Sequence, residues 1–255
     1  MISVPAEATP LRGAPWQRVV VLGDSVAEGV REPYDGYRDL SWIDRIAEAL
    51  AASVAGLEVT NLGRRNLFAA EVRERQLETA VALRPELAIV AAGGNDALRP
   101  SFAPDELAGD LDAIVAPLRR AGADVLMIEL LDIVAAGLIP PEHADALDER
   151  LRALSEITRA VAHRHGALLV EMRTHPAAAD PDIYASDRLH LNARGHAIVG
   201  AEAVRVLSEA LGTRQALRPP ALDLTFDEVT EQLFWPHRPP GEWTLEVTRP
   251  GRAVE

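Results

Sequence analysis

The sequence predicts an α/β protein built on a doubly wound parallel sheet with five strands. Two observations carry this prediction. Five short apolar runs alternate along the chain with longer segments in which apolar residues recur at the spacing of a helix. A connection from one strand through a helix to the next parallel strand is right-handed, so the strands share one direction and helices cover the sheet.

The first two strands flank a clearly marked helix. The apolar run over 20–22 ends abruptly in Gly-Asp-Ser, as expected for a buried strand that delivers polar residues to its carboxyl end. Ser41 followed by Asp44 has the pattern of a capping box, and apolar residues then recur at helical spacing over 42–50. A short run over 57–60 predicts the second strand.

The middle of the chain contributes the third and fourth strands. A helix from about residue 68 is expected to end before Pro85, because a residue that precedes proline disfavours the α conformation. Residues 87–92 are apolar throughout and predict a strand buried on both faces. Pro104 opens the next helix, and the fourth strand is expected over 125–131.

A last strand and two helices complete the predicted domain. A proline-containing loop leads to a long helix that Gly166 closes, and 167–171 predict the fifth strand. An irregular stretch over 174–191 precedes the final helix, which Asn192 caps.

From residue 212 onward, repeated prolines replace the alternation of strands and helices. We therefore predict one domain over 18–211 and a C-terminal extension over 212–255 that packs on its surface. Phe234, Trp235 and Trp243 are the candidate anchors of this extension.

The composition is that of an ordinary globular protein and excludes several functions. Of 255 residues, 48% are hydrophobic, and the net charge of −13 argues against a nucleic-acid partner. The absence of cysteine excludes disulfides, a thiolate nucleophile and a cysteine-ligated metal. No apolar run approaches the roughly 20 residues of a membrane span, and 1–18 lack the apolar core of a signal peptide. We therefore expect a cytoplasmic protein without stable membrane insertion.

Polar residues follow several of the predicted strands or precede the last helix. Because the carboxyl ends of parallel strands meet at one edge of the sheet, we expect these residues to converge there. The segments concerned are 24–25, 61–66, 95–96 and 187–190.

These residue types fit acyl transfer. Ser25 needs a base to become a nucleophile, and His190 can take its proton. Asp187, three residues before His190, can reach the other ring nitrogen and fix the tautomer. The Asn95 amide and backbone N–H groups, including that of Ser25, can stabilise the oxyanion. The alternative for Gly-Asp-Ser alone is a turn whose polar residues only cap a helix.

The chain resembles the SGNH, or GDSL-type, hydrolase family, especially its bacterial lysophospholipase-like esterases. The resemblance rests on Gly-Asp-Ser at 23–25, Gly-x-Asn-Asp at 93–96 and Asp-x-x-His at 187–190, in the family's order. It implies a flavodoxin-like three-layer α/β/α sandwich and a serine esterase that acts on a small-molecule ester and needs no metal or other cofactor.

One block departs from the family pattern. The family usually supplies a glycine N–H to the oxyanion hole five residues after an asparagine that ends the second strand. Counted from Asn61, that position is Asn66, and Gly63 is the nearest glycine. Asn66 can still offer its backbone N–H, because asparagine tolerates unusual backbone angles, whereas Gly63 serves only in a shifted loop.

Three functions remain open at this point. Hydrolysis of short-chain or acetyl esters is the first, and acyl transfer to an alcohol or removal of acetyl groups from a glycan is the second. The substrate pocket that separates them is expected from loops 31–39 and 134–146. The third is a non-catalytic α/β binding module, which the altered glycine position favours.

Other polar residues have simpler interpretations. His196 is expected to be structural, and His163 and His165 to lie at a solvated helix end rather than bind a metal. Asp24 and Asp96 are expected to brace their loops through hydrogen bonds.

Overall fold

The computed structural model describes residues 10–212, 225–227 and 232–234. Its centre is a five-stranded sheet in the order β3-β1-β4-β5-β6, and every neighbouring pair is parallel. Counted along the chain, this order is 2-1-3-4-5, which is flavodoxin-like, so the predicted fold class is confirmed. The strands are β1 (Arg18–Gly23), β3 (Glu58–Asn61), β4 (Leu87–Ala91), β5 (Asp124–Ile128) and β6 (Leu168–Val170).

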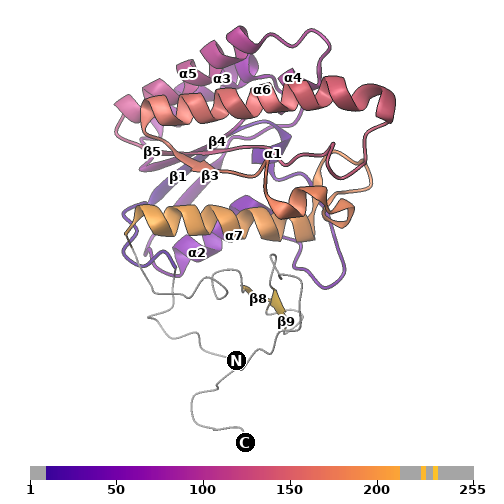
Figure 1. The fold of residues 1–255 in the computed structure, drawn as a ribbon. Coiled ribbons are helices and arrows are strands. Elements are labelled where there is room, and N and C mark those ends of the chain that lie inside the picture. Colours follow the sequence, from indigo (N-terminus) through magenta and orange to yellow (C-terminus); the bar gives the residue numbers. More distant parts are fainter. Residues whose placement is uncertain (1–9, 213–224, 228–231, 235–255) are drawn as a thin grey trace, which may run out of the picture.

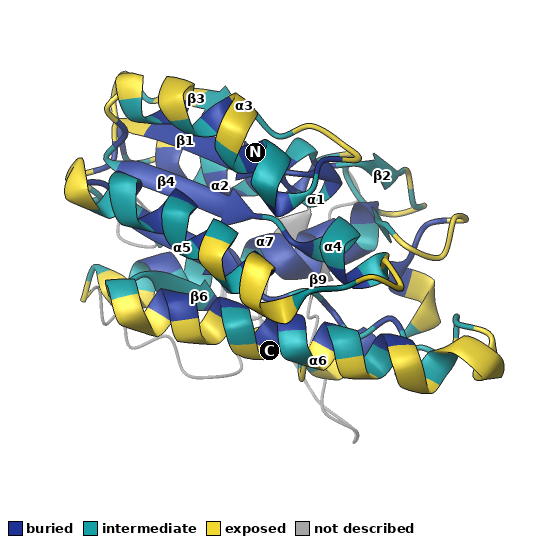
Figure 2. Ribbon diagram, turned by 90° about the horizontal axis from the view of Figure 1, so that it is seen from above, coloured by how far each residue is buried: buried dark blue, intermediate teal, exposed yellow. Residues whose placement is uncertain are grey.

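Helices cover both faces of the sheet and make three layers (Figure 1). On one face lie α2 (Trp42–Ala51) and α7 (Ala193–Ala210), and on the other lie α3 (Ala69–Ala82), α5 (Pro104–Arg120) and α6 (Pro141–His165). Figure 2 shows the consequence for burial, with β4 enclosed and the outer faces of α3, α5 and α6 exposed.

The order of the strands reverses between β1 and β4, and this switch point is where open α/β sheets bind ligands. Two short helices, α1 (Ser25–Glu28) and α4 (Gly94–Leu98), begin just beyond the ends of these two strands. Ser25 and Asn95 therefore flank the switch point.

The expected elements differ from the structure mainly at their ends. The strand predicted over 125–131 ends at Ile128, because its neighbours β4 and β6 end at Ala91 and Val170 and offer no further pairing. A second small sheet was not predicted. It pairs β2 (Arg31–Glu32) with β7 (Leu191–Asn192) in parallel.

Residues 176–183, expected to be irregular, contain the 3₁₀ helices η2 (Pro176–Ala179) and η3 (Pro181–Ile183). The core also extends to the N-terminal side of Arg18, since Leu11 and Trp16 are buried in it.

The C-terminal extension is described only in part. Strand β8 (Thr225–Asp227) pairs antiparallel with β9 (Gln232–Phe234). The prediction that the extension packs on the domain stays untested, because of the three predicted anchors only Phe234 lies in a described element, β9, and Trp235 and Trp243 fall outside the described residues. Within the described ranges, no helix is long and apolar enough to cross a membrane, and no group of three or more His, Asp or Glu side chains forms a candidate metal site.

Candidate active site

The turn that presents Ser25 depends on a glycine. Gly23 has a φ of 143°, and a Cβ there would lie 1.8 Å from Ala91 O on β4. The Asp24 N–H donates to the same carbonyl oxygen at 3.1 Å. Only a glycine lets the end of β1 approach β4 this closely while the chain turns into α1.

A buried glutamine fixes this turn from the other side. The Gly23 N–H donates to Gln76 Oε1 at 2.8 Å, and Gln76 Nε2 donates to Gly23 O at 2.9 Å. Gln76 comes from α3 and is only 4% exposed. The sequence did not predict this role for Gln76. The one signal available was a polar residue in a predicted helix that packs against the core.

Ser25, His190 and Asp187 lie in one hydrogen-bonded line. The Ser25 Oγ is 2.8 Å from His190 Nε2, and His190 Nδ1 is 2.6 Å from Asp187 Oδ2. The other carboxylate oxygen of Asp187 accepts the backbone N–H groups of His190 and Leu189 at 2.9 and 3.0 Å. The carboxylate thus orients both the ring and the turn that carries it.

The charge of Asp187 suits a proton on Nδ1 of His190. Partial burial acts to raise the pKa of Asp187, but the His190 ring and two backbone N–H donors outweigh it and lower the pKa below its ordinary value. An ionised Asp187 accepts the Nδ1 proton, which leaves Nε2 as the acceptor that faces Ser25.

The loop that carries His190 is tied to the loop after α1. Glu32 accepts the backbone N–H and the hydroxyl of Ser186, one residue before Asp187. Parallel pairing of β2 with β7 joins the segments on either side of these contacts. Asn192 caps α7 by accepting the N–H groups of Arg194 and Gly195, as predicted. These contacts fix His190 relative to Ser25 although 165 residues separate them.

Asn95 is positioned by a contact to the loop after β3. Its Nδ2 donates to Leu67 O at 2.9 Å. An amide nitrogen carries two protons, so this bond orients the group and leaves a second N–H for a ligand. Asn95 lines the same cavity as Ser25.

Backbone hydrogen bonds in the loop after β3 show which of the two candidate oxyanion donors, the N–H of Gly63 or that of Asn66, has no acceptor in the described part of the protein. The Gly63 N–H donates to Asn61 Oδ1 at 2.8 Å, and the N–H groups of Leu62, Arg64 and Arg65 also have acceptors. Within the described residues, no acceptor takes the N–H of Asn66. Gly63 is therefore not available as the donor.

Packing explains why the glycine of this loop stands at position 63. A Cβ on Gly63 would lie 2.5 Å from Glu28 N in α1. Asn66 adopts a φ of 67°, the left-handed conformation that glycine usually supplies and asparagine tolerates. Asn66 lies outside the lining of the cavity, so its N–H remains a proposed donor.

A small, largely apolar cavity adjoins Ser25. Its volume is about 90 Å³, on the order of six to nine water-sized volumes. The prediction that loops 31–39 and 134–146 build the pocket is wrong, because the lining comes from the ends of the sheet, from α1, α2, α4, α6 and α7, and from the loop before His190. Beyond the catalytic segments, the apolar lining includes Leu98, Leu130, Leu131, Ile133, Leu151 and Leu189.

Comparison with known families identifies the chain. The model of the GDSL-like lipase/acylhydrolase family matches residues 21–198, which is well over half of the sequence. The chain belongs to this family. The resemblance inferred from its motifs is thereby confirmed, and the chain is a carboxylic ester hydrolase of the serine esterase type.

Solved structures of other proteins share the fold of this GDSL-like hydrolase. LAE5, an α/β hydrolase from the metagenome of Lake Arreo, is 22% identical with a TM-score of 0.62, over 78% of this chain and 98% of its own. TesA is 24% identical with a TM-score of 0.57, over 80% and 99%. Axe2, an acetyl-xylooligosaccharide esterase from Geobacillus stearothermophilus, is 18% identical with a TM-score of 0.61, over 77% and 94%. No curated protein matches the chain.

Asp24, the aspartate of the family's Gly-Asp-Ser block, braces the turn as predicted. Its Oδ1 accepts the Val26 N–H at 3.0 Å. Burial raises the pKa of Asp24 to about 7, although the Val26 N–H opposes this shift. Asp96 plays a similar part, since its Oδ2 accepts the Ala69 N–H at the start of α3.

Two further polar side chains, His165 and Arg65, form contacts of their own that do not involve Ser25, His190 or Asp187. His165 contacts Asp112 of α5 at 2.9 Å. Arg65 forms an ion pair with Glu28 at 2.8 Å.

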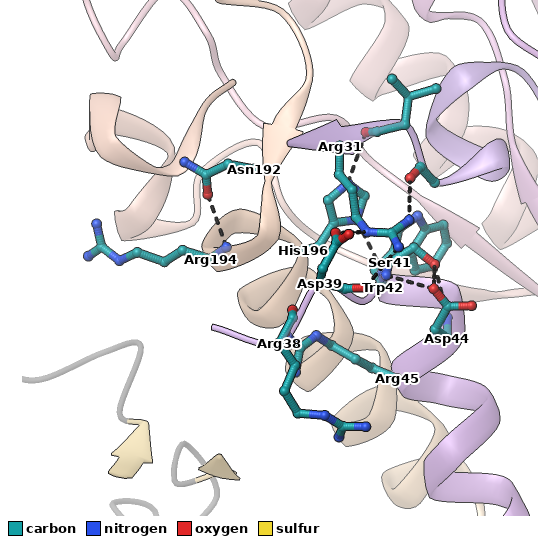
Figure 3. Close-up of polar contacts among 12 residues, drawn as sticks. Arg31, Arg38, Asp39, Ser41, Trp42, Asp44, Arg45, Asn192, Arg194 and His196 are labelled. Carbon is teal, nitrogen blue, oxygen red and sulfur yellow. Dashed lines mark hydrogen bonds and ion pairs between the residues drawn. The ribbon is translucent and has the colours of Figure 1, made fainter. Parts of the chain in front are cut away.

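His196 is a buried connector rather than a reactive group (Figure 3). Its Nδ1 accepts the Trp42 N–H at 3.1 Å, and its Nε2 is 3.1 Å from Val30 O, so α7 is joined to α2 and to the segment before β2. The same view shows the Ser41–Asp44 capping box at the start of α2. Burial lowers the pKa of His196 to about 4.

This buried neutral histidine is expected to make stability depend on pH. Its folded-state pKa of about 4 lies below the ordinary 6.5, so the stability is fully present above pH 6.5 and is lost as the pH falls toward 4. Relative to His196→Gln, the wild type should lose about 2 kcal/mol of unfolding free energy between pH 7 and pH 5. Urea denaturation of both proteins at each pH measures this. A difference between them that does not change with pH would contradict the neutral, buried state.

Substitutions in the proposed oxyanion hole should show whether a residue contributes through its side chain, as proposed for Asn95, or through its backbone N–H, as proposed for Asn66. Asn95→Ala removes an amide and should lower kcat by about 10²–10³-fold. Asn66→Gly keeps the backbone N–H and a positive φ, so kcat should stay within a few-fold. The two variants are compared on one ester under saturating conditions. Equal, large losses in both would mean that the Asn66 side chain itself takes part in catalysis.

Proposed function

We propose that this GDSL-like hydrolase cleaves short-chain carboxylic esters through an acyl-enzyme formed on Ser25, with His190 as base and acid and Asp187 as its orienting carboxylate. The observation that carries the proposal is the continuous contact from Ser25 Oγ through the His190 ring to Asp187, with distances of 2.8 and 2.6 Å. These lengths allow proton transfer without rearrangement of the site.

The first half of the reaction forms the acyl-enzyme. Ser25 Oγ attacks the ester carbonyl carbon while His190 Nε2 takes the hydroxyl proton. The resulting oxyanion accepts hydrogen bonds from the Ser25 N–H and the Asn95 amide, with the Asn66 N–H as the third proposed donor. His190 then gives its proton to the departing alkoxide, and the carbon–oxygen bond to the alcohol breaks.

The second half restores the enzyme. Water attacks the acyl carbon as His190 takes one of its protons, and the same proton returns to Ser25 Oγ as the carboxylic acid leaves. Asp187 stays ionised throughout and stabilises the imidazolium, which its lowered pKa supports.

The catalytic mutants known for Axe2 support these roles. They carry alanine in place of a serine, an aspartate and a histidine, and the last two positions are three residues apart. Asp187 and His190 have the same spacing in this chain.

The size of the cavity supports a short acyl group. About 90 Å³ accommodates a few heavy atoms, so kcat/KM for p-nitrophenyl esters should be highest for acetate or butyrate and at least tenfold lower for octanoate. The rates are measured with purified protein below the solubility limit of each ester. A preference for octanoate would contradict the short-chain assignment.

The same acyl-enzyme also serves transfer to an alcohol. Product analysis with added alcohol acceptors distinguishes the two outcomes, and we expect free acid as the main product. New ester as the main product would identify an acyltransferase.

A further inference from the structure

An exposed leucine lies at the mouth of the cavity, next to His190 in the chain. Leu189 is 40% exposed and lines the same cavity as Ser25 and His190. Single apolar side chains on a protein surface are common, and Val59 and Leu83 are exposed to a similar extent. Of these large apolar residues exposed in the described part of the chain, Leu189 alone lines the cavity. It is therefore open both to solvent and to the site.

The turn that carries Leu189 holds it in a fixed position. The N–H groups of Leu189 and His190 both donate to Asp187 Oδ1, at 3.0 and 2.9 Å. Arg188 lies between them in the chain, donates its N–H to Ala185 O, and has a φ of 59°, which is uncommon for a residue with a side chain. Such strain persists where the surrounding structure fixes the backbone, and it clusters at sites that bind ligands. The place of Leu189 beside His190 is thus set by the fold itself.

The proposed proton path indicates which part of an ester lies beside Leu189. His190 Nε2 gives its proton to the oxygen of the departing alcohol, so this oxygen lies within hydrogen-bonding distance of the ring. The carbonyl oxygen is held instead by donors from α1 and α4, the Ser25 N–H and the Asn95 amide. The group attached to the alcohol oxygen therefore leaves the site along the loop that carries His190, where Leu189 is exposed.

The surface on this side of the site suits an apolar group. Two polar side chains of the same turn are already engaged, Asp187 with His190 and Ser186 with Glu32. An alkyl or aryl group that covers Leu189 removes apolar surface from water and binds more tightly for that reason. A sugar in the same place would lose water from its hydroxyl groups against a side chain that offers them no hydrogen bond.

We infer that Leu189 is a specificity-determining residue that contacts the alcohol part of the ester and favours an apolar alcohol over a sugar. The preferred substrates are then short-chain esters of alkyl or aryl alcohols rather than acetylated glycans. This inference rests on the proposed esterase function, which specifies the acyl group but not the alcohol.

The test compares hexyl acetate with methyl acetate, which share the acyl group and release alcohols of similar basicity. Acid release at constant pH gives kcat/KM for each ester, and the wild-type ratio should favour hexyl acetate by about fivefold or more. Leu189→Ala removes most of the apolar side chain and should lower this ratio by about threefold or more. Leu189→Met keeps an apolar side chain of similar volume, so its ratio should stay within about twofold of the wild type. A ratio measured within one variant is unaffected by partial loss of folded protein.

Leu83→Ala is the matched control. Leu83 lies at the C-terminal end of α3, is 38% exposed and does not line the cavity. The same substitution is thus made at a leucine of similar exposure away from the site, and the ratio should keep its wild-type value.

Three results would overturn the inference while hydrolysis of p-nitrophenyl acetate still supports the esterase function. They are a wild-type ratio below about fivefold, an unchanged ratio in Leu189→Ala, and a higher kcat/KM for an acetylated xyloside than for hexyl acetate. If no ester is hydrolysed and a fluorophosphonate does not label Ser25, the proposed function fails and the inference fails with it.

Discussion

Ser25→Ala is expected to lower kcat for p-nitrophenyl butyrate by about 10⁵–10⁶-fold. Alanine removes the only atom that forms the acyl-enzyme, and the residual rate then comes from ester binding and the oxyanion donors. The structure provides no other serine at hydrogen-bonding distance from His190 among the described residues. Initial rates at saturating ester, with the protein concentration raised to detect slow turnover, measure the loss.

Ser53→Ala is the matched control for this substitution. Ser53 follows α2, its hydroxyl is buried without a hydrogen-bond partner in the described structure, and it does not line the cavity. Its replacement should leave kcat within twofold. Comparable rates for wild type and Ser25→Ala would contradict the assignment of the nucleophile.

Asp187→Asn is expected to lower kcat by about 10⁴-fold without loss of the fold. The new amide keeps an oxygen for the N–H groups of Leu189 and His190, so the turn is preserved. Its nitrogen, however, donates to His190 Nδ1 and drives the ring proton to Nε2, where it blocks proton transfer from Ser25. The measurement is kcat across pH 5–9 together with the melting temperature.

Asp182→Asn provides the comparison, because Asp182 is an exposed aspartate of the same segment that does not contact His190. Its activity should stay within twofold of the wild type. Near-complete activity in Asp187→Asn at every pH would mean that Ser25 and His190 act as a pair without a carboxylate.

The sequence was sufficient to predict the layers, the approximate strand positions and the three residues, Ser25, His190 and Asp187, whose side chains lie in one hydrogen-bonded line. An uninterrupted apolar run such as 87–92 indicates a strand that is buried on both faces, as β4 is. Because the strands are parallel, their carboxyl ends lie at the same edge of the sheet. The signals for Ser25, Asp187 and His190 are local, because each lies in a short motif whose chemistry can be recognised from the residue types.

The remaining features depend on contacts between residues far apart in the chain. Gln76 supports Gly23 from 53 positions away, and no local pattern marks it. The pairing of β2 with β7 involves two residues on each side, too few for any periodicity. The reason why this loop has a glycine at position 63 and an asparagine at position 66 also became clear only from the structure, in which the backbone of Gly63 lies against α1.

The cavity was the least predictable feature for the same reason. Its walls come from several elements that lie far apart in the sequence.

Labelling of the native protein with a fluorophosphonate tests the central claim most directly, because the probe reacts only with a serine that a base activates. Mass spectrometry of the intact protein and of its peptides should find one adduct, on Ser25, and no adduct after denaturation or in His190→Ala. No adduct on the folded protein, or an adduct on a different serine, would contradict the catalytic site described above.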